Sequence, residues 1–172
     1  MRLVNENDKA EASSNREAWL KSAIVLLTPK FSSINAVVPA VKVSVGFPGG
    51  GSAKTRIGEH WSPQASDDGI GSIFISPVLS DSVEVLGVLV HEMVHAAVGT
   101  KAGHGPLFKR CATKVGLEGK MRSTTVGPEL EYYLKDLISV IGDYPHAKLN
   151  LSMGRKKQST RLIKQVCSSC EY

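Results

Sequence analysis

Apolar residues follow two rhythms along this chain, one typical of helices and one typical of strands. Helical spacing comes first, in "SSNREAWLKSAIVLLTPKF", which follows a polar leader at residues 1–13. Ser13 or Ser14 is expected to cap this helix, and Pro29 to end it. The face that it would bury carries Trp19, Leu20, Ala23, Ile24 and Leu27.

Strand spacing follows in three short stretches. "AVKVSVGF" alternates valines with other residues, and "RIGEHWS" and "SIFISP" are further strands bounded by glycine- and proline-containing loops. The sequence therefore predicts a three-stranded sheet, which we expect to be mostly antiparallel.

Helical spacing then returns for the rest of the ordered region. In "LSDSVEVLGVLVHEMVHAAVGT", Asp81 with Glu84 resembles a capping box, and Gly99 is a plausible end. A second helix is predicted from Pro106 to Gly116 and a third in "GPELEYYLKDLISVIGDYP". The second would bury Leu107, Phe108, Cys111, Ala112 and Val115. Helix, strands and then helices predict an α+β domain at residues 14–147.

Charge divides the chain into a neutral body and a basic tail at residues 148–172. The whole net charge of +5 comes from this tail, whose only acidic residue is Glu171. Its basic side chains could bind DNA phosphates without reading sequence, or could only aid solubility. Those that would contact DNA are Arg155, Lys156, Lys157, Arg161 and Lys164.

Composition is that of an ordinary soluble protein, and no segment reaches the roughly 18–20 apolar residues that cross a bilayer. The first residues also lack the apolar stretch of a secretory signal. We expect a cytoplasmic protein without membrane contacts.

Three of the five histidines lie between Val88 and Arg110, around one glutamate. His91 and His95 are four residues apart, so a helix places both on one face, with Glu92 beside them. This is H-E-x-x-H, in which two histidines hold zinc and the glutamate acts as general base on the bound water. Two buried structural histidines are the alternative interpretation.

A catalytic zinc site normally has three protein ligands and one open position. His104, in the glycine-flanked "TKAGHGPLF", is the candidate for the third ligand, and Glu118, Glu129 and Glu131 are its rivals. The longer pattern H-E-x-x-H-x-x-G-x-x-H fails because Val98 and Lys101 replace its glycine and histidine. Zinc is the expected metal, although cobalt or manganese would fit a similar ligand set.

These motifs resemble the SprT-like metallopeptidase domain, the family that includes Spartan and predicted peptidases of bacteriophages. The likeness covers about Ile57 to Leu117, with His104, Gly105 and Phe108 matching the family's His-Gly-x-x-Phe. It implies a small zincin fold and a zinc ion held by His91, His95 and His104. It also implies Glu92 as the base in peptide hydrolysis, with DNA-associated proteins as substrates.

Many members of that family carry a zinc ribbon with two C-x-x-C pairs, and this chain has one, Cys167 and Cys170. One pair cannot form a Cys₄ site alone, so a second metal site here needs further ligands, and a free reduced pair is the alternative. Cys111 lies on the predicted apolar helix face and is expected to be buried and inert.

Other candidate side chains carry weaker signals. His60 and His146 are expected to serve packing or to lie at the surface, and the oxyanion-stabilising donor is sought among Tyr132, Tyr133 and Tyr144. We expect a zinc-dependent endopeptidase whose strand "SIFIS" pairs with an extended peptide. The alternatives are a nucleic-acid-binding module with a zincin fold and little turnover, and a hydrolase of non-protein amides.

Overall fold

The computed structural model describes residues 15–49, 56–153 and 169 of the 172-residue chain. Its strands are β1 (Val41–Val45), β2 (Gly58–Trp61), β3 (Gly71–Ile75), β4 (Leu117–Lys120) and β5 (Ser123–Val126). Its α-helices are α2 (Arg16–Ser33), α3 (Ser82–Val98), α4 (Pro106–Val115) and α5 (Pro128–Ile141). Short 3₁₀ helices are η1 (Pro63–Ala65), η2 (Thr100–Ala102) and η3 (Leu151–Met153). The predicted α+β class is confirmed.

The three-stranded sheet is mixed, so the prediction of a mostly antiparallel sheet is wrong. Its order is β1-β3-β2, with β1 parallel and β2 antiparallel to the central β3. The connection between β1 and β2, residues 46–57, is far longer than a tight hairpin turn. It therefore does not force these two strands to pair, and β3 lies between them.

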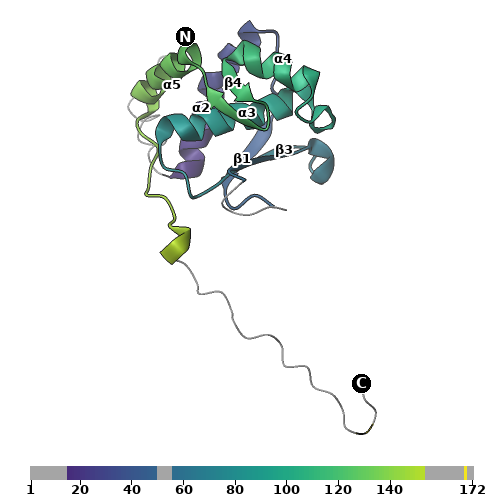
Figure 1. Cartoon of the computed structure of the whole chain (residues 1–172), viewed down its shortest axis with the longest axis vertical. Helices are drawn as coiled ribbons and strands as arrows, with labels where there is room; N and C mark the ends of the chain where they lie inside the picture. Colours follow the sequence, from purple (N-terminus) through teal and green to yellow (C-terminus); the bar gives the residue numbers. More distant parts are fainter. Residues whose placement is uncertain (1–14, 50–55, 154–168, 170–172) are drawn as a thin grey trace.

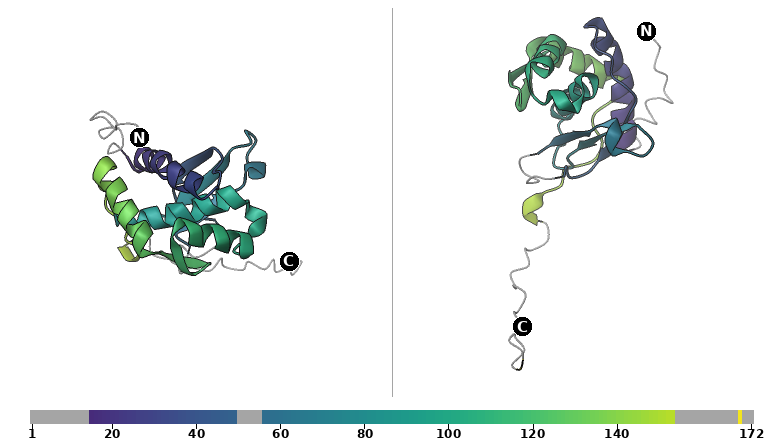
Figure 2. Two further views of the ribbon diagram at one scale, coloured as in Figure 1. Left: turned by 90° about the horizontal axis from the view of Figure 1, so that it is seen from above. Right: turned by 90° about the vertical axis from the view of Figure 1, so that its right-hand side faces the viewer.

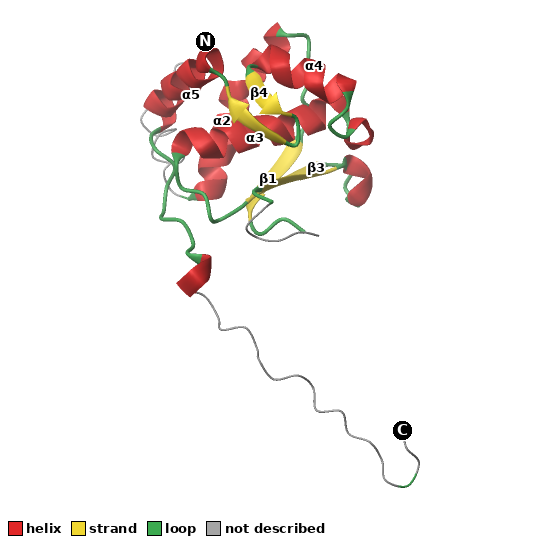
Figure 3. Ribbon diagram, in the orientation of Figure 1, coloured by secondary structure: helices red, strands yellow, loops and turns green. Residues whose placement is uncertain are grey.

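The sheet and the helices share one apolar core, with α3 at its centre. Figures 1 and 3 show α3 between the sheet on one side and α4 with the β4–β5 hairpin on the other. Residues two apart on β3 point to the same face, and Ile73 and Ile75 are both wholly buried. The turned views in Figure 2 show the helices gathered over that face of the sheet.

Helix α2 begins and continues differently from the prediction. Asn15 is its cap, and its side-chain oxygen accepts from the Ala18 N–H at 2.8 Å. Ser13 and Ser14 lie outside the described residues. The helix also runs through Pro29 to Ser33, because the next turn carries Phe31, which is wholly buried in the core. That burial offsets the one backbone hydrogen bond that a proline removes.

The predicted ends of α3 and α4 are confirmed. The Asp81 carboxylate accepts from the Glu84 N–H at 2.8 Å, and α3 stops before Gly99, whose φ is 82°. Helix α4 ends at Gly116 in the left-handed conformation. The sequence predicts five buried side chains on α4, and Leu107 is not buried. It is 52% exposed, near the N-terminus of the helix. The others are buried: Phe108, Cys111, Ala112 and Val115.

The β4–β5 hairpin is an element that the sequence analysis did not predict. Its antiparallel pairing places Leu117 opposite Val126 and Gly119 opposite Thr124. It packs against α3, where a Cβ on Gly87 would lie only 2.6 Å from Val126 Cγ2. A glycine in the middle of a helix lowers stability by about 1 kcal/mol relative to alanine. At Gly87 the missing side chain allows the hairpin to approach the helix closely.

No α-helix among the described residues is long and apolar enough to span a membrane.

Candidate metal centre

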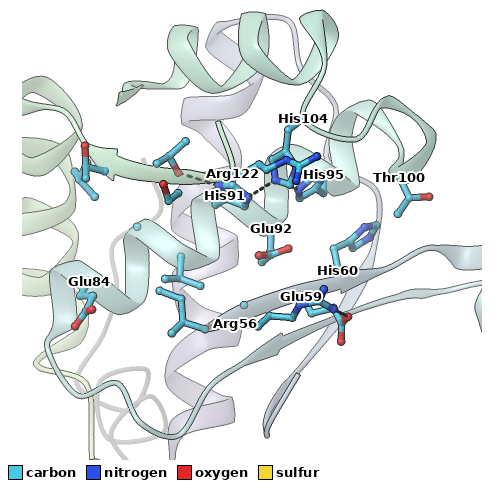
Figure 4. Close-up of a pocket in the computed structure, with 18 residues that line it drawn as sticks. Arg56, Glu59, His60, Glu84, His91, Glu92, His95, Thr100, His104 and Arg122 are labelled. Atoms are coloured by element: carbon cyan, nitrogen blue, oxygen red, sulfur yellow. Dashed lines mark hydrogen bonds and ion pairs between the residues drawn. The ribbon is translucent and has the colours of Figure 1, made fainter. Parts of the chain in front are cut away.

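Three imidazole rings from two neighbouring elements converge on one point. His91 and His95 lie one turn apart on α3, and His104 follows η2. The Nε2 atom of His104 is 3.2 Å from Nε2 of His91 and 3.2 Å from Nε2 of His95. Figure 4 shows the three rings pointing toward one another, as the sequence analysis predicts for metal ligands.

These distances match the ligand shell of a divalent metal. Zinc binds imidazole nitrogen at about 2.0–2.1 Å, which places two nitrogens of a tetrahedral shell about 3.3 Å apart. One candidate ligand atom from each of the three residues lies within 4.8 Å of the others. The three histidines therefore lie close enough together to bind one metal ion.

His104 reaches this point because the chain reverses sharply after α3. Gly99 and Gly103 both have positive φ, 82° and 49°, in a region that residues with a Cβ rarely adopt. Between them η2 is held by backbone bonds, including Gly103 N–H to Thr100 O at 3.0 Å. The glycine-flanked turn therefore folds back over α3, as the sequence predicts.

Phe108 forms the apolar wall of the centre. Its ring centroid lies 4.9 Å from that of His91, 4.4 Å from that of His95 and 4.9 Å from that of His104. It is wholly buried on the first turn of α4. One aromatic ring thus contacts all three histidines and restricts their rotamers.

The environment keeps the three imidazoles neutral. Burial, and then the charge of His104, lowers the pKa of His91 to about 4. Burial, followed by the charges of the other histidines, lowers the pKa of His95 to about 3. Burial and the nearby Arg122 also lower the pKa of His104. Neutral imidazoles with free lone pairs are the form that binds a metal.

Glu92 is buried beside the histidines, with 6% of its surface exposed. Burial raises its pKa to about 8, with Glu59 adding to the shift and Arg56 opposing it. A carboxyl group that titrates near neutral pH can both accept and return a proton. Its role as a general base stays a prediction.

Strand β2 passes unusually close to Glu92. A Cβ on Gly58 would lie 2.6 Å from Glu92 Oε1 and 2.5 Å from Val88 Cγ1. No larger residue fits there without displacing the strand or the carboxyl group. Gly58 is a site residue that the sequence analysis did not identify, and only its position opposite α3 reveals it.

A cavity of about 810 Å³ opens over the histidines and extends along β2. Consecutive residues 56–60 line it. If one face of the strand bordered the cavity, only every second residue would line it, so consecutive lining residues indicate that the backbone edge does. Strand β3 pairs on both of its edges, so the prediction that "SIFIS" is the strand available to a peptide is wrong. Among the described residues, the second edge of β2 has no strand partner.

Two arginines line the cavity, and only one of them forms an ion pair within the described residues. Arg56 Nη1 lies 2.6 Å from Glu59 Oε1, and Glu59 also accepts from Trp61 Nε1 at 3.0 Å. Arg122, at the hairpin turn, is exposed and has no ion-pair partner among the described residues. The unpaired positive charge therefore lies on the hairpin side of the histidines, as Figure 4 indicates.

His60 lines this cavity beside the three candidate ligands and is not one of them, as expected. Both of its ring nitrogens are buried without a hydrogen-bond partner among the described residues, and burial lowers its pKa. His146, in contrast, is exposed as predicted. Alternation along β2 could have indicated that His60 and Gly58 face the same side.

The tyrosines considered as oxyanion donors do not line the cavity. Tyr133 donates to Leu26 O at 2.8 Å, Tyr144 is buried against Trp19, and Tyr132 is 72% exposed on α5. That expectation is therefore wrong for all three.

The rival metal ligands are also elsewhere. Glu131 pairs with Lys135 at 2.6 Å, Glu118 lies against Gly127, and Glu129 is exposed on α5. Within the described residues, the histidine triad is the one cluster that could hold a metal.

Cys111 is 8% exposed, and burial raises the pKa of its thiol, as expected of an inert core cysteine. The predicted second metal site, Cys167 and Cys170, lies outside the described residues. So do the predicted DNA contacts at Arg155, Lys156, Lys157, Arg161 and Lys164.

The chain matches no family model, no curated protein and no solved structure.

Proposed function

We propose that this protein is a zinc-dependent endopeptidase of the SprT-like type, with a zincin fold. One observation carries the proposal: three neutral imidazoles converge at metal-ligand spacing, with a buried glutamate on the same helix beside a cavity. A purely structural metal site has no need for an adjacent carboxyl group that titrates near neutral pH, or for an open cavity.

The ligand set would be His91, His95 and His104, and a bound zinc ion would supply an activated water and polarise the scissile carbonyl. Glu92 would be the residue that accepts a proton beside this site and returns it to the leaving amine. The low exposure of Glu92 and the close passage of β2 at Gly58 leave its side chain little room to move. Phe108 excludes water from the opposite side of the ligands.

The substrate would be an extended peptide lying along β2. The edge of this strand that no described residue pairs with offers backbone N–H and C=O groups for strand addition. Residues 56–60 bring that edge to the cavity that contains the histidines. Backbone pairing selects extended chains and reads little sequence, which is consistent with unfolded protein segments as substrates.

DNA-associated proteins are the substrate class that the family resemblance implies. The basic tail would hold the enzyme near nucleic acid by contacts that weaken with salt. This part of the proposal depends on residues 155–164 of the sequence alone.

Replacing Glu92 by Gln tests the mechanism, because the amide keeps the shape and cannot take a proton. We expect hydrolysis of a fluorescently labelled unfolded protein to fall by about 10²–10⁴-fold. Zinc content, measured by atomic absorption, should be unchanged. Glu129→Gln, the same change at an exposed position of α5 that does not line the cavity, is the matched control and should retain full activity.

Full activity in Glu92→Gln would show that the proposed base is wrong. A zinc-loaded wild-type protein that cleaves no unfolded or DNA-bound protein would reject the peptidase. Cleavage of small amides without peptides would favour a non-protein substrate, and salt-sensitive DNA binding without cleavage would favour a binding module.

A further inference from the structure

The β4–β5 hairpin contacts the metal centre through one side chain. Thr124 Oγ1 lies 2.8 Å from Nδ1 of His91. Among the three histidines, His91 is the one whose second ring nitrogen has a hydrogen-bond partner within the described residues. The contact joins segments 33 positions apart in the sequence.

The direction of this hydrogen bond follows from the role of the ring. Since Nε2 of His91 faces the other histidines and has to be unprotonated to bind a metal, the proton lies on Nδ1. Nδ1–H therefore donates and the threonine hydroxyl accepts. An acceptor at this position selects the metal-binding tautomer and fixes the rotation of the ring.

Two contacts between α3 and β5 position Thr124: Gly87 meets Val126, and His91 meets Thr124 itself. Gly87 and His91 are one turn apart on α3, and Thr124 and Val126 are two apart on β5, so each pair shares a face. The close approach of Val126 to Gly87 brings Thr124 to His91. Exposure along β5 agrees, because Thr124 and Val126 are half-buried while Ser123 and Thr125 are exposed.

We propose that Thr124 is a positioning residue that orients His91 for metal binding, and that the hairpin is seated on Gly87 for this purpose. The inference rests on the metal centre of the proposed function, and it does not require peptide hydrolysis. It also gives a physical reason for a glycine in the middle of α3.

Thr124→Val is the direct test, because valine keeps the shape and removes the acceptor. We expect the zinc dissociation constant, measured by competition with a chromogenic chelator, to rise about 10-fold, the low end of effects seen for such groups. Thr124→Ser should restore wild-type affinity. Thr125→Val removes a hydroxyl from the same strand on its other face, and its zinc affinity should equal the wild type.

A second measurement separates orientation from general loosening of the hairpin. In the metal-free wild-type protein, nitrogen NMR of the imidazoles should place the His91 proton on Nδ1, and Thr124→Val should give a mixture of tautomers. Thermal unfolding of the metal-free variants verifies that they are folded.

Zinc affinity in Thr124→Val within twofold of the wild type would overturn the inference, as would an equal loss in Thr125→Val. Zinc binding with the expected loss but without peptidase activity would support the inference and reject the proposed enzyme. Failure of the wild type to bind zinc would overturn both.

Discussion

Two of the regions where this molecule buries polar groups are built differently. Arg16, 9% exposed at the start of α2, donates to the carbonyls of Pro145, His146 and Ala147, with distances from 2.6 to 3.4 Å. Its guanidinium also lies 5.2 Å from the ring centroid of Tyr144. These contacts, which we call the Arg16 clamp, join α2 to the segment after α5.

At the metal centre the buried polar groups have few such partners. Glu92 is 6% exposed beside the histidines, and both ring nitrogens of His60 are buried without a hydrogen-bond partner among the described residues. The histidines instead direct lone pairs at one point. A buried group that is fully bonded stabilises the fold, whereas one left unbonded lowers stability and is available to a ligand.

Breaking the clamp should have the largest effect on stability. Arg16→Met leaves three carbonyls without their donor, and we expect the free energy of unfolding to fall by roughly 2–4 kcal/mol in urea titrations. Zinc affinity of the folded protein should not change. Arg110→Met, on an exposed face of α4, should cost less than about 0.5 kcal/mol, and an equal loss there would contradict the role of the clamp.

Gly58→Ala should disturb the candidate metal centre, and we expect it to reduce catalysis more than stability. The new methyl group overlaps Glu92 Oε1 and Val88 Cγ1, so the base or strand β2 has to move. A displacement near 1 Å can reduce kcat/KM by about 10²-fold. Gly46→Ala is the matched control, since its Cβ would meet nothing closer than 3.7 Å. Undiminished kcat/KM in Gly58→Ala would mean that the contact does not position Glu92.

The smallest effect should have the opposite sign. Glu92→Met replaces a buried carboxyl group by an apolar chain of similar length, and the metal-free protein should gain roughly 1 kcal/mol in its free energy of unfolding. Glu84→Met on the exposed side of α3 should change it by less than about 0.5 kcal/mol. A Glu92→Met protein less stable than the wild type would show that Glu92 contributes to the fold.

Local signals explain which features the sequence could predict. The cap at Asp81, the stop at Gly99 and the spacing of His91 and His95 are properties of a single helix. Pairing in the sheet and the approach of β2 to Glu92 depend on contacts between distant segments. The role of the hairpin could not be predicted for the same reason. It depends on the contacts of Thr124 with His91 and of Val126 with Gly87, both of which lie on α3.

The nine-residue spacing between His95 and His104 has a mechanical consequence. A cation shared by these residues would be a removable cross-link between α3 and the segment that leads into α4. The two helices contact each other and Phe108 is wholly buried, so we expect removal of the cation to loosen the short turn at Thr100–Ala102 before the rest of the domain.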